Sequence, residues 1–128
     1  MINTKELRLG NLFANIEDDS IYKVSKINED TIEGICINNM GWFGEQHFHL
    51  IEQVLPIRIT EEWLLKFGFE KKGDFWFVKS GIKIENRNNG FSYFRYLSEI
   101  KILSVHQLQN LYFALTGEEL MQVSEGKN

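Results

Sequence analysis

The stretch that most constrains the fold of this chain is SVHQLQNLYFALTGEEL, residues 104–120. Ser104 is a suitable N-cap because its hydroxyl can accept from a first-turn backbone N–H, and Gln107, three residues later, can reach back to the N–H of the cap. Gly117 can end the helix in a left-handed conformation. Apolar residues recur on one face, at Val105, Leu108, Leu111, Tyr112 and Leu115. This pattern predicts an amphipathic helix that covers a sheet.

The first part of the chain carries short β-type segments with little helical periodicity. Turn residues separate five of them, at 7–14, 21–27, 31–37, 45–50 and 54–59. Pro56 suits an edge strand, because it cannot donate a hydrogen bond to a neighbour. Five short strands in about fifty residues predict a small SH3-like barrel, in which antiparallel closure removes exposed edges.

The second part begins with a short helix signal and continues with strands. Thr60 is a suitable N-cap, and Gly68 can end the helix. Strand segments follow, separated by turn signals at Lys72-Gly73, Ser80-Gly81 and Asn88-Asn89-Gly90. We therefore expect an α+β protein in which an SH3-like barrel (1–58) packs on an antiparallel meander flanked by a short and a longer helix (60–120), followed by a polar tail (121–128).

Composition limits the class of protein. Hydrophobic residues make up 43% of the 128 residues and aromatic residues 13%, which indicates a globular protein. The single cysteine, Cys36, cannot form an internal disulfide, so we expect a reducing compartment and interpret this thiol as a small buried hydrophobe. No leader opens the chain and no apolar run approaches the ~18 residues of a membrane span, which predicts a soluble cytoplasmic protein.

Charge is unevenly distributed along the chain. Residues 1–59 hold five basic and nine acidic side chains and so carry the whole net charge of −4, whereas residues 71–101 hold seven basic and three acidic ones. Attraction of the whole protein to nucleic acid is not expected, although a local basic patch remains open.

Three stretches resemble a known family. LRLGN near the start, TEEWLLKFGFEK at 60–71 and VHQLQNLYFALTGEEL at 105–120 are similar to a family of small uncharacterised proteins of phages and prophage-like mobile elements of gut anaerobic bacteria. The resemblance spans nearly the whole chain and is loosest over the expected barrel. It implies an accessory protein of a phage or mobile element, and it supplies no catalytic residues.

Two places carry aromatic side chains that suggest a protein-binding surface. Met40, Trp42 and Phe43 lie between glycines, where a loop would display them to a partner. The alternative is that these rings close the barrel end. On the last helix, Phe113 shares an otherwise polar face with His106, Gln109 and Asn110, which is typical of a partner or homodimer contact and equally of a wide core.

Basic residues interleaved with aromatic ones provide the second hypothesis. A sheet surface that gathers them could bind single-stranded nucleic acid by stacking and charge. The candidate residues are Lys79, Lys83, Arg87, Phe91, Tyr93 and Arg95. The alternative is that these lysines and arginines line the solvated face of a half-covered sheet.

His47 and His49 are the residues most suggestive of a metal. Two residues apart on a strand, they would point to the same side, and Glu45, Cys36 or His106 could supply a third ligand. No established metal motif accompanies them, and the alternative is a solvated strand face with Phe48 buried behind it. No nucleophile elbow, phosphate loop or dinucleotide motif occurs either. We expect no metal, no cofactor and no enzymatic activity.

The sequence thus predicts a non-enzymatic phage or mobile-element accessory protein that binds a host or phage protein, a host-defence antagonist being one case. The alternative is an accessory single-stranded nucleic-acid-binding protein that uses strands 79–101. A small hydrolase ranks third.

Overall fold

The computed structural model describes residues 2–87 and 90–123. They fall into two compact units. The first holds the residues up to Ile57 together with Ser104–His106, and the second holds the remainder. Each unit contains one five-stranded sheet.

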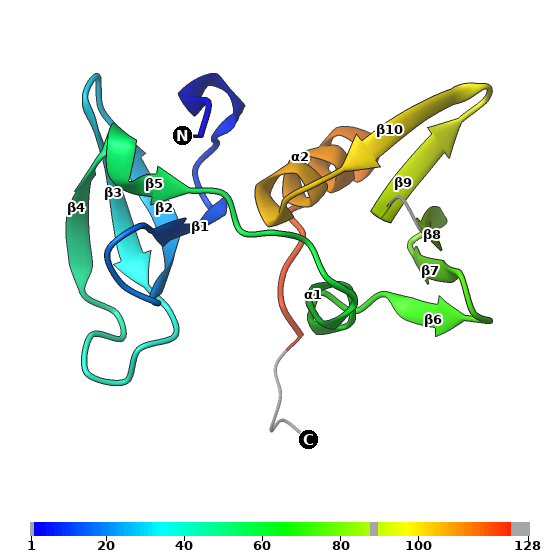
Figure 1. Cartoon of the computed structure of the whole chain (residues 1–128), viewed down its shortest axis with the longest axis horizontal. Helices are drawn as coiled ribbons and strands as arrows, with labels where there is room; N and C mark the ends of the chain where they lie inside the picture. Colours follow the sequence, from blue (N-terminus) through cyan, green and yellow to red (C-terminus); the bar gives the residue numbers. More distant parts are fainter. Residues whose placement is uncertain (1, 88–89, 124–128) are drawn as a thin grey trace. The chain divides into compact units, whose positions relative to one another are not determined.

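The sheet of the first unit is antiparallel and curls into a half-barrel (Figure 1). Its strand order is β4-β3-β2-β1-β5. The strands are β1 (Leu12–Asn15), β2 (Ile21–Ile27), β3 (Thr31–Cys36), β4 (Gln46–Leu50) and β5 (Val54–Leu55), with two 3-10 helices, η1 (Thr4–Glu6) and η2 (Ile51–Gln53).

Two of these strands are shorter than the sequence predicts by several residues. The expected strand at 7–14 begins only at Leu12, because Arg8–Asn11 forms a turn. In this turn the N–H of Arg8 donates to Asn11 Oδ1 at 2.7 Å, and Gly10 has a φ of 91°. The expected strand at 54–59 ends at Leu55, next to Pro56, which lacks the N–H that a further ladder bond would need.

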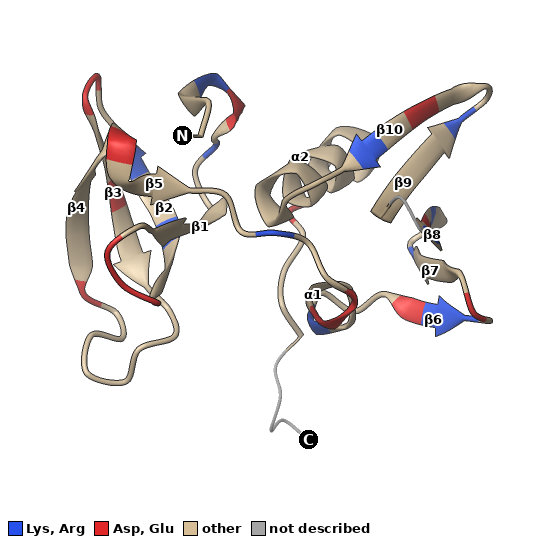
Figure 2. Cartoon of the chain, in the orientation of Figure 1, with Lys and Arg blue, Asp and Glu red and all other residues tan. Residues whose placement is uncertain are grey.

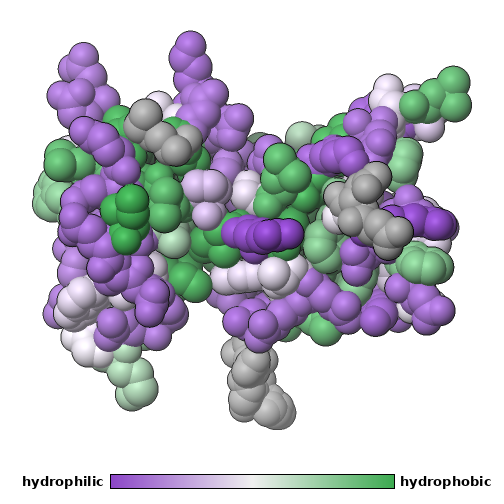
Figure 3. Space-filling model, in the orientation of Figure 1, coloured by the Kyte–Doolittle hydropathy of each residue, from purple (hydrophilic) through white to green (hydrophobic). Residues whose placement is uncertain are grey.

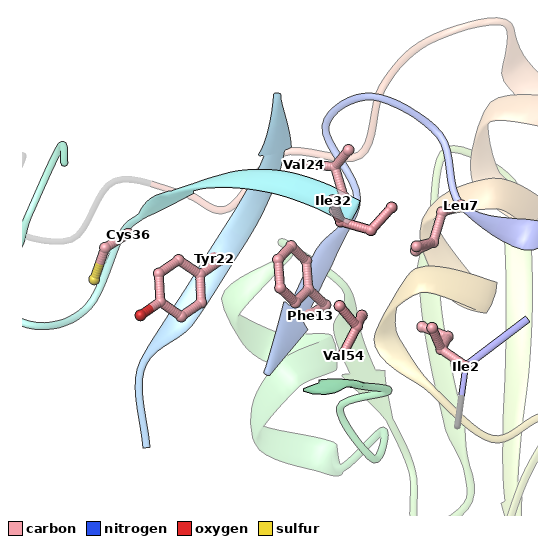
Figure 4. Packing of buried hydrophobic residues seen from close by; sticks show 8 residues of the cluster. All are labelled: Ile2, Leu7, Phe13, Tyr22, Val24, Ile32, Cys36 and Val54. Atoms are coloured by element: carbon pink, nitrogen blue, oxygen red, sulfur yellow. The ribbon is translucent and has the colours of Figure 1, made fainter. Parts of the chain in front are cut away.

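The core of the first unit lies on the inner side of the curled sheet. Figure 4 shows its side chains, with the rings of Phe13 and Tyr22 at the centre. The cluster comprises Ile2, Leu7, Phe13, Tyr22, Val24, Ile32, Cys36 and Val54. Cys36 is fully buried, in agreement with its interpretation as a small core residue.

Gly34 on β3 allows the sheet to pack tightly against these rings. A Cβ atom at this position would lie 2.9 Å from Phe13 Cζ and 2.9 Å from Tyr22 Cβ. Real Cβ atoms do not approach other atoms so closely, and neither neighbour can move away, because Phe13 and Tyr22 are 0% and 1% exposed. The absence of a side chain at Gly34 is therefore a packing requirement.

We predict that Gly34→Ala destabilises the protein by about 1–3 kcal/mol, because the new methyl group overpacks the core. Urea unfolding followed by circular dichroism would measure the change. Gly41→Ala is the matched control, since a Cβ there would meet only Asn39 Oδ1 at 3.5 Å, an ordinary contact. Equal stability of Gly34→Ala and the wild type would contradict the packing requirement.

The second unit contains an antiparallel meander with the order β10-β9-β8-β7-β6. Its elements are α1 (Glu61–Lys66), β6 (Glu70–Lys72), β7 (Trp76–Lys79), β8 (Ile82–Arg87), β9 (Gly90–Arg95), β10 (Ser98–Ile102) and α2 (Val105–Thr116), the last belonging to this unit from Gln107 onward. The turn between β7 and β8 has Ser80 and Gly81 at φ values of 53° and 80°, which is typical of a two-residue hairpin turn. Of the predicted turn at Asn88-Asn89-Gly90, residues 88–89 lie outside the described part of the chain, as do residues 124–128 of the predicted tail.

The predicted helix ends are confirmed for the segment after Thr60. The N–H of Trp63 donates to Thr60 Oγ1 at 3.2 Å, as an N-cap requires. Gly68 follows with a φ of 89°, and the N–H of Phe69 donates to the carbonyl of Leu64 at 3.0 Å. This is the bond that closes a Schellman motif.

Helix α2 begins and ends close to the predicted residues. Gly117 follows it with a φ of 77°. Gln107 does reach back to the start of the helix, because its Oε1 accepts from the N–H of Leu103 at 2.8 Å. Tyr112 joins the helix to the sheet, because its hydroxyl lies 2.9 Å from Ser80 Oγ and Lys79 Nζ lies 5.7 Å from its ring centroid.

The protein is thus α+β, with a curled antiparallel sheet in one unit and a second sheet with a helix in the other. Within residues 2–87 and 90–123, no helix combines the length and the apolar character needed to cross a membrane.

Candidate functional site

The loop between β3 and β4, residues 37–45, displays the predicted aromatic cluster. Met40 is 96% exposed and Phe43 66%, whereas Trp42 is less exposed, at 36%. The loop projects from the sheet, and in Figure 3 it is pale to green where hydrophilic residues surround it. The structure therefore brings Met40 and Phe43 to the surface together.

Backbone hydrogen bonds hold this loop in one conformation. The N–H of Trp42 donates to the carbonyl of Asn39 at 2.9 Å, and the N–H of Gly44 donates to the carbonyl of Cys36 at 2.9 Å. Asn39 also forms a hydrogen bond to a residue outside the loop, since its Nδ2 donates to Ser20 Oγ at 3.2 Å. The exposure of Met40 thus occurs in an ordered loop.

Ring contacts join Trp42 to the core. Its ring centroid lies 5.0 Å from that of His47, and His47 lies 5.5 Å from Tyr22. Tyr22 in turn stacks on Phe13 at 5.5 Å. Ring contacts therefore anchor Trp42, whereas Met40 and Phe43 remain largely exposed.

The strand that carries the two histidines has its faces reversed relative to the sequence interpretation. His47 and His49 do point to the same side, but that side is the interior, where His49 is 3% exposed. Phe48, expected to be buried behind them, is 68% exposed. The register explains this, because His47 pairs with Gly34 and His49 with Ile32, and both of these partners are buried on the inner face.

A buried hydrogen bond fixes the tautomer of His49. Asn15 Oδ1 accepts from the N–H of Glu17 at 2.7 Å, so Asn15 Nδ2 is the atom that faces His49 Nδ1, at 2.6 Å. His49 Nδ1 is then the acceptor, and the proton of the neutral ring lies on Nε2. This nitrogen is buried without a hydrogen-bond partner in the described structure. The rings of Tyr22 and Phe13 pack around it, at 4.2 and 5.1 Å.

This surrounding favours the neutral imidazole. Burial lowers the pKa of His49 below its ordinary value of 6.5, and the charge of His47 lowers the pKa further, while Asp18 acts in the opposite direction. His47 is less buried and lies 3.2 Å from Glu45 Oε1 through its Nε2. Across the described ranges, no group of three or more His, Cys, Asp and Glu side chains is placed to hold a metal ion.

We predict that the first unit loses stability as the pH falls below about 6.5. The unfolded chain binds a proton at His49 more readily than the folded one, so protonation favours unfolding between 6.5 and the lower folded pKa. Measuring the free energy of unfolding from pH 7.5 to 5 would show this loss. His49→Phe should reduce the slope, because no titrating group remains at this position.

Phe48→Ser is the control for this measurement, because it changes an exposed, non-titrating side chain of the same strand and should leave the slope unchanged. Identical slopes for the wild type and His49→Phe would show that the buried imidazole does not govern the pH dependence.

Two polar residues of the face that was predicted to be polar on the last helix are buried. His106 and Gln109 are 2% and 3% exposed, whereas Phe113 is 39% exposed. Phe113 lies in the second unit and Met40 in the first, so each is a separate candidate contact. A homodimer through Phe113 stays a prediction.

His106 belongs to a hydrogen-bonded chain that the sequence did not suggest. Its Nδ1 lies 3.0 Å from Ser104 Oγ and its Nε2 lies 3.1 Å from Glu6 Oε1. Serine, histidine and carboxylate also form catalytic triads, but there the serine bonds Nε2 and the acid bonds Nδ1. The order is inverted here, and Ser104 is only 5% exposed. The chain therefore has a structural role, tying η1 to the start of α2.

The structure divides the predicted nucleic-acid-binding residues between the two faces of the second sheet. Lys79 pairs with the buried Ile82, and its Nζ donates to the carbonyl of Phe67 at 2.6 Å. Tyr93 pairs with the buried Ile84 and so lies on the same covered face as Lys79. Phe91 and Arg95 lie two residues from Tyr93 on the same strand and therefore share this face. Lys83 and Arg87 lie on the opposite face. The residues therefore do not form the single basic surface that the nucleic-acid hypothesis requires.

Sequence reasoning missed the aromatic residues on the outer face of this sheet. Trp76 and Phe94 are 36% and 44% exposed, and neither was among the basic and aromatic residues that the sequence suggested on these strands. The alternation in DFWFVKS was a usable signal, because it places Trp76 and Val78 on the face opposite Phe77.

Compared with known proteins, the chain matches no family model, no curated protein and no solved structure.

Proposed function

We propose that this chain is a non-enzymatic accessory protein that binds another protein through Met40 and Phe43. The observation that carries the proposal is the combination of an ordered loop with two large exposed apolar side chains at its tip. Large exposed hydrophobic residues in a loop of fixed conformation are typical of binding surfaces.

The energetics of association favour this loop as a binding element. Burying an exposed aromatic side chain in a partner's pocket supplies free energy, and the cost of ordering the loop has already been met in the free protein. Trp42 stabilises the conformation of the loop, because the contact of its ring with His47 holds the loop against β4.

The resemblance to phage and mobile-element proteins suggests the kind of partner. We place the protein in the cytoplasm of a bacterial host, where it would bind a host or phage protein. The acidic character of residues 1–59 suits a partner with a basic surface, as a host-defence protein that binds nucleic acid would have.

We propose that the curled sheet of the first unit is a small barrel of the SH3-like kind, supported by its five short antiparallel strands. We also propose that α1 and α2 flank the meander of the second unit. SH3-like barrels often bind peptides with aromatic side chains between their loops, which agrees with the position of Met40 and Phe43.

Site-specific photocrosslinking would test the function. We predict that the protein with a benzoylphenylalanine in place of Met40, irradiated in bacterial host cells, gives a discrete crosslinked adduct with another protein. Phe43→Ser, added to the same protein, should reduce the yield of the adduct several-fold because it removes apolar contact area at the interface.

The chain offers a closely matched control in Phe48, which is 68% exposed against 66% for Phe43 and lies on the opposite face of β4 from His47. Phe48→Ser should leave the adduct unchanged. Adducts that are absent, or that Phe48→Ser reduces as much as Phe43→Ser does, would argue against binding through the loop.

A further inference from the structure

The outer face of the second sheet is built differently from its covered face. On the covered face lie the buried side chains of Phe77 and Ile84, which pair across β7 and β8. Alternation places Trp76, Val78 and Lys83 on the other face, where Val78 pairs directly with Lys83. This outer face is therefore part apolar and part charged.

A shallow groove of about 250 Å³ lies on this face. It is lined by Trp76, Gly81, Lys83, Tyr93 and Phe94. Tyr93 is the one lining residue whose side chain alternates to the covered face, so Trp76, Lys83 and Phe94 supply the side chains on the outer face. Trp76 and Phe94 both remain partly exposed there, and Lys83 Nζ lies 5.9 Å from the centroid of the Trp76 ring. The groove thus combines aromatic walls with one ammonium group.

The charge of Lys83 is not balanced in the way that its neighbours' charges are. Three ion pairs occupy the surrounding strands, and each joins a glutamate to a basic residue two positions away: Glu70 with Lys72, Glu85 with Arg87, and Glu99 with Lys101. Figure 2 shows opposite charges side by side along β6 and β10. Lys83 forms no such pair with any described residue, and it is the only charged residue among those that line the groove.

We propose that this groove binds a peptide segment of a partner protein in which an Asp or Glu stands next to an aromatic or aliphatic side chain. The carboxylate pairs with Lys83, and the apolar side chain packs against Trp76 and Phe94. This surface is separate from the Met40–Phe43 loop of the first unit, so the two proposals stand independently.

The same observations disfavour nucleic acid in this groove. A nucleic-acid strand presents one phosphate per nucleotide and needs several cations along its path. Here Lys83 is the only lining cation, and the other cations of the outer face, Lys72, Arg87 and Lys101, are each paired with a carboxylate, that of Glu70, Glu85 or Glu99. A peptide with one carboxylate beside an apolar side chain therefore matches this groove better, because the groove offers one ammonium group, that of Lys83, beside the rings of Trp76 and Phe94.

Selection from a displayed library of random nine-residue peptides would test this inference. The enriched peptides should share an acidic residue adjacent to an aromatic or aliphatic one. A synthesised peptide from the selection should bind Trp76→Ala about tenfold more weakly than the wild type, because the mutation removes a wall of the groove.

A double-mutant comparison then isolates the ion pair. Changing the acidic residue of that peptide to its amide should weaken binding to the wild type by about fivefold and should have little effect on binding to Lys83→Gln. Lys26→Gln, an exposed lysine of the first unit, is the control and should bind like the wild type.

Three results would overturn the proposal. The selection could enrich no peptide, the enriched peptides could lack acidic residues or bind regardless of Trp76 and Lys83, or a fluorescent oligothymidylate could bind through these two residues in place of a peptide. Peptides whose binding depends on Phe43 and not on Trp76 would support the loop proposal and count against this one.

Discussion

A continuous set of ring contacts in the first unit is the interaction on which its candidate site depends. Phe13 and Tyr22 form the centre of the core, His49 packs against both, and His47 continues the contacts to Trp42 at the base of the loop. Because aromatic rings are stiff and have few rotatable bonds, these contacts fix the loop relative to the core at a low cost in side-chain entropy. The exposed side chains beside Trp42 are therefore presented from a fixed base.

The two units present apolar surface by different physical means. In the first unit a hydrogen-bonded loop displays Met40 and Phe43, whereas in the second the outer face of a sheet leaves Trp76 and Phe94 partly exposed around Lys83. An exposed apolar loop favours a partner with a concave pocket, and a shallow groove with one cation favours an extended acidic segment. Under the two proposals, each surface would bind a partner of its own.

Signals that act within a few residues could be predicted from the sequence, and those that depend on strand register could not. Gly68 ends its helix as predicted, because its left-handed conformation and the hydrogen bond from the N–H of Phe69 to the carbonyl of Leu64 involve only residues close in sequence. Hydropathy alone places Phe48 inside and His49 outside, but pairing with β3 turns His49 into the core. Likewise Lys79 and Lys83 look equivalent in sequence, and only the alternation of β7 and β8 separates their faces.

Amide hydrogen exchange would test most directly whether the core holds the Met40–Phe43 loop in place. The N–H groups of Trp42, Gly44 and Glu45 donate to backbone carbonyls at 2.8–2.9 Å. We predict that they exchange far more slowly than in an unstructured chain, and that His47→Ala, which removes the ring beneath Trp42, abolishes most of this protection. Exchange at unstructured rates in the wild type, or unchanged protection in His47→Ala, would contradict the account.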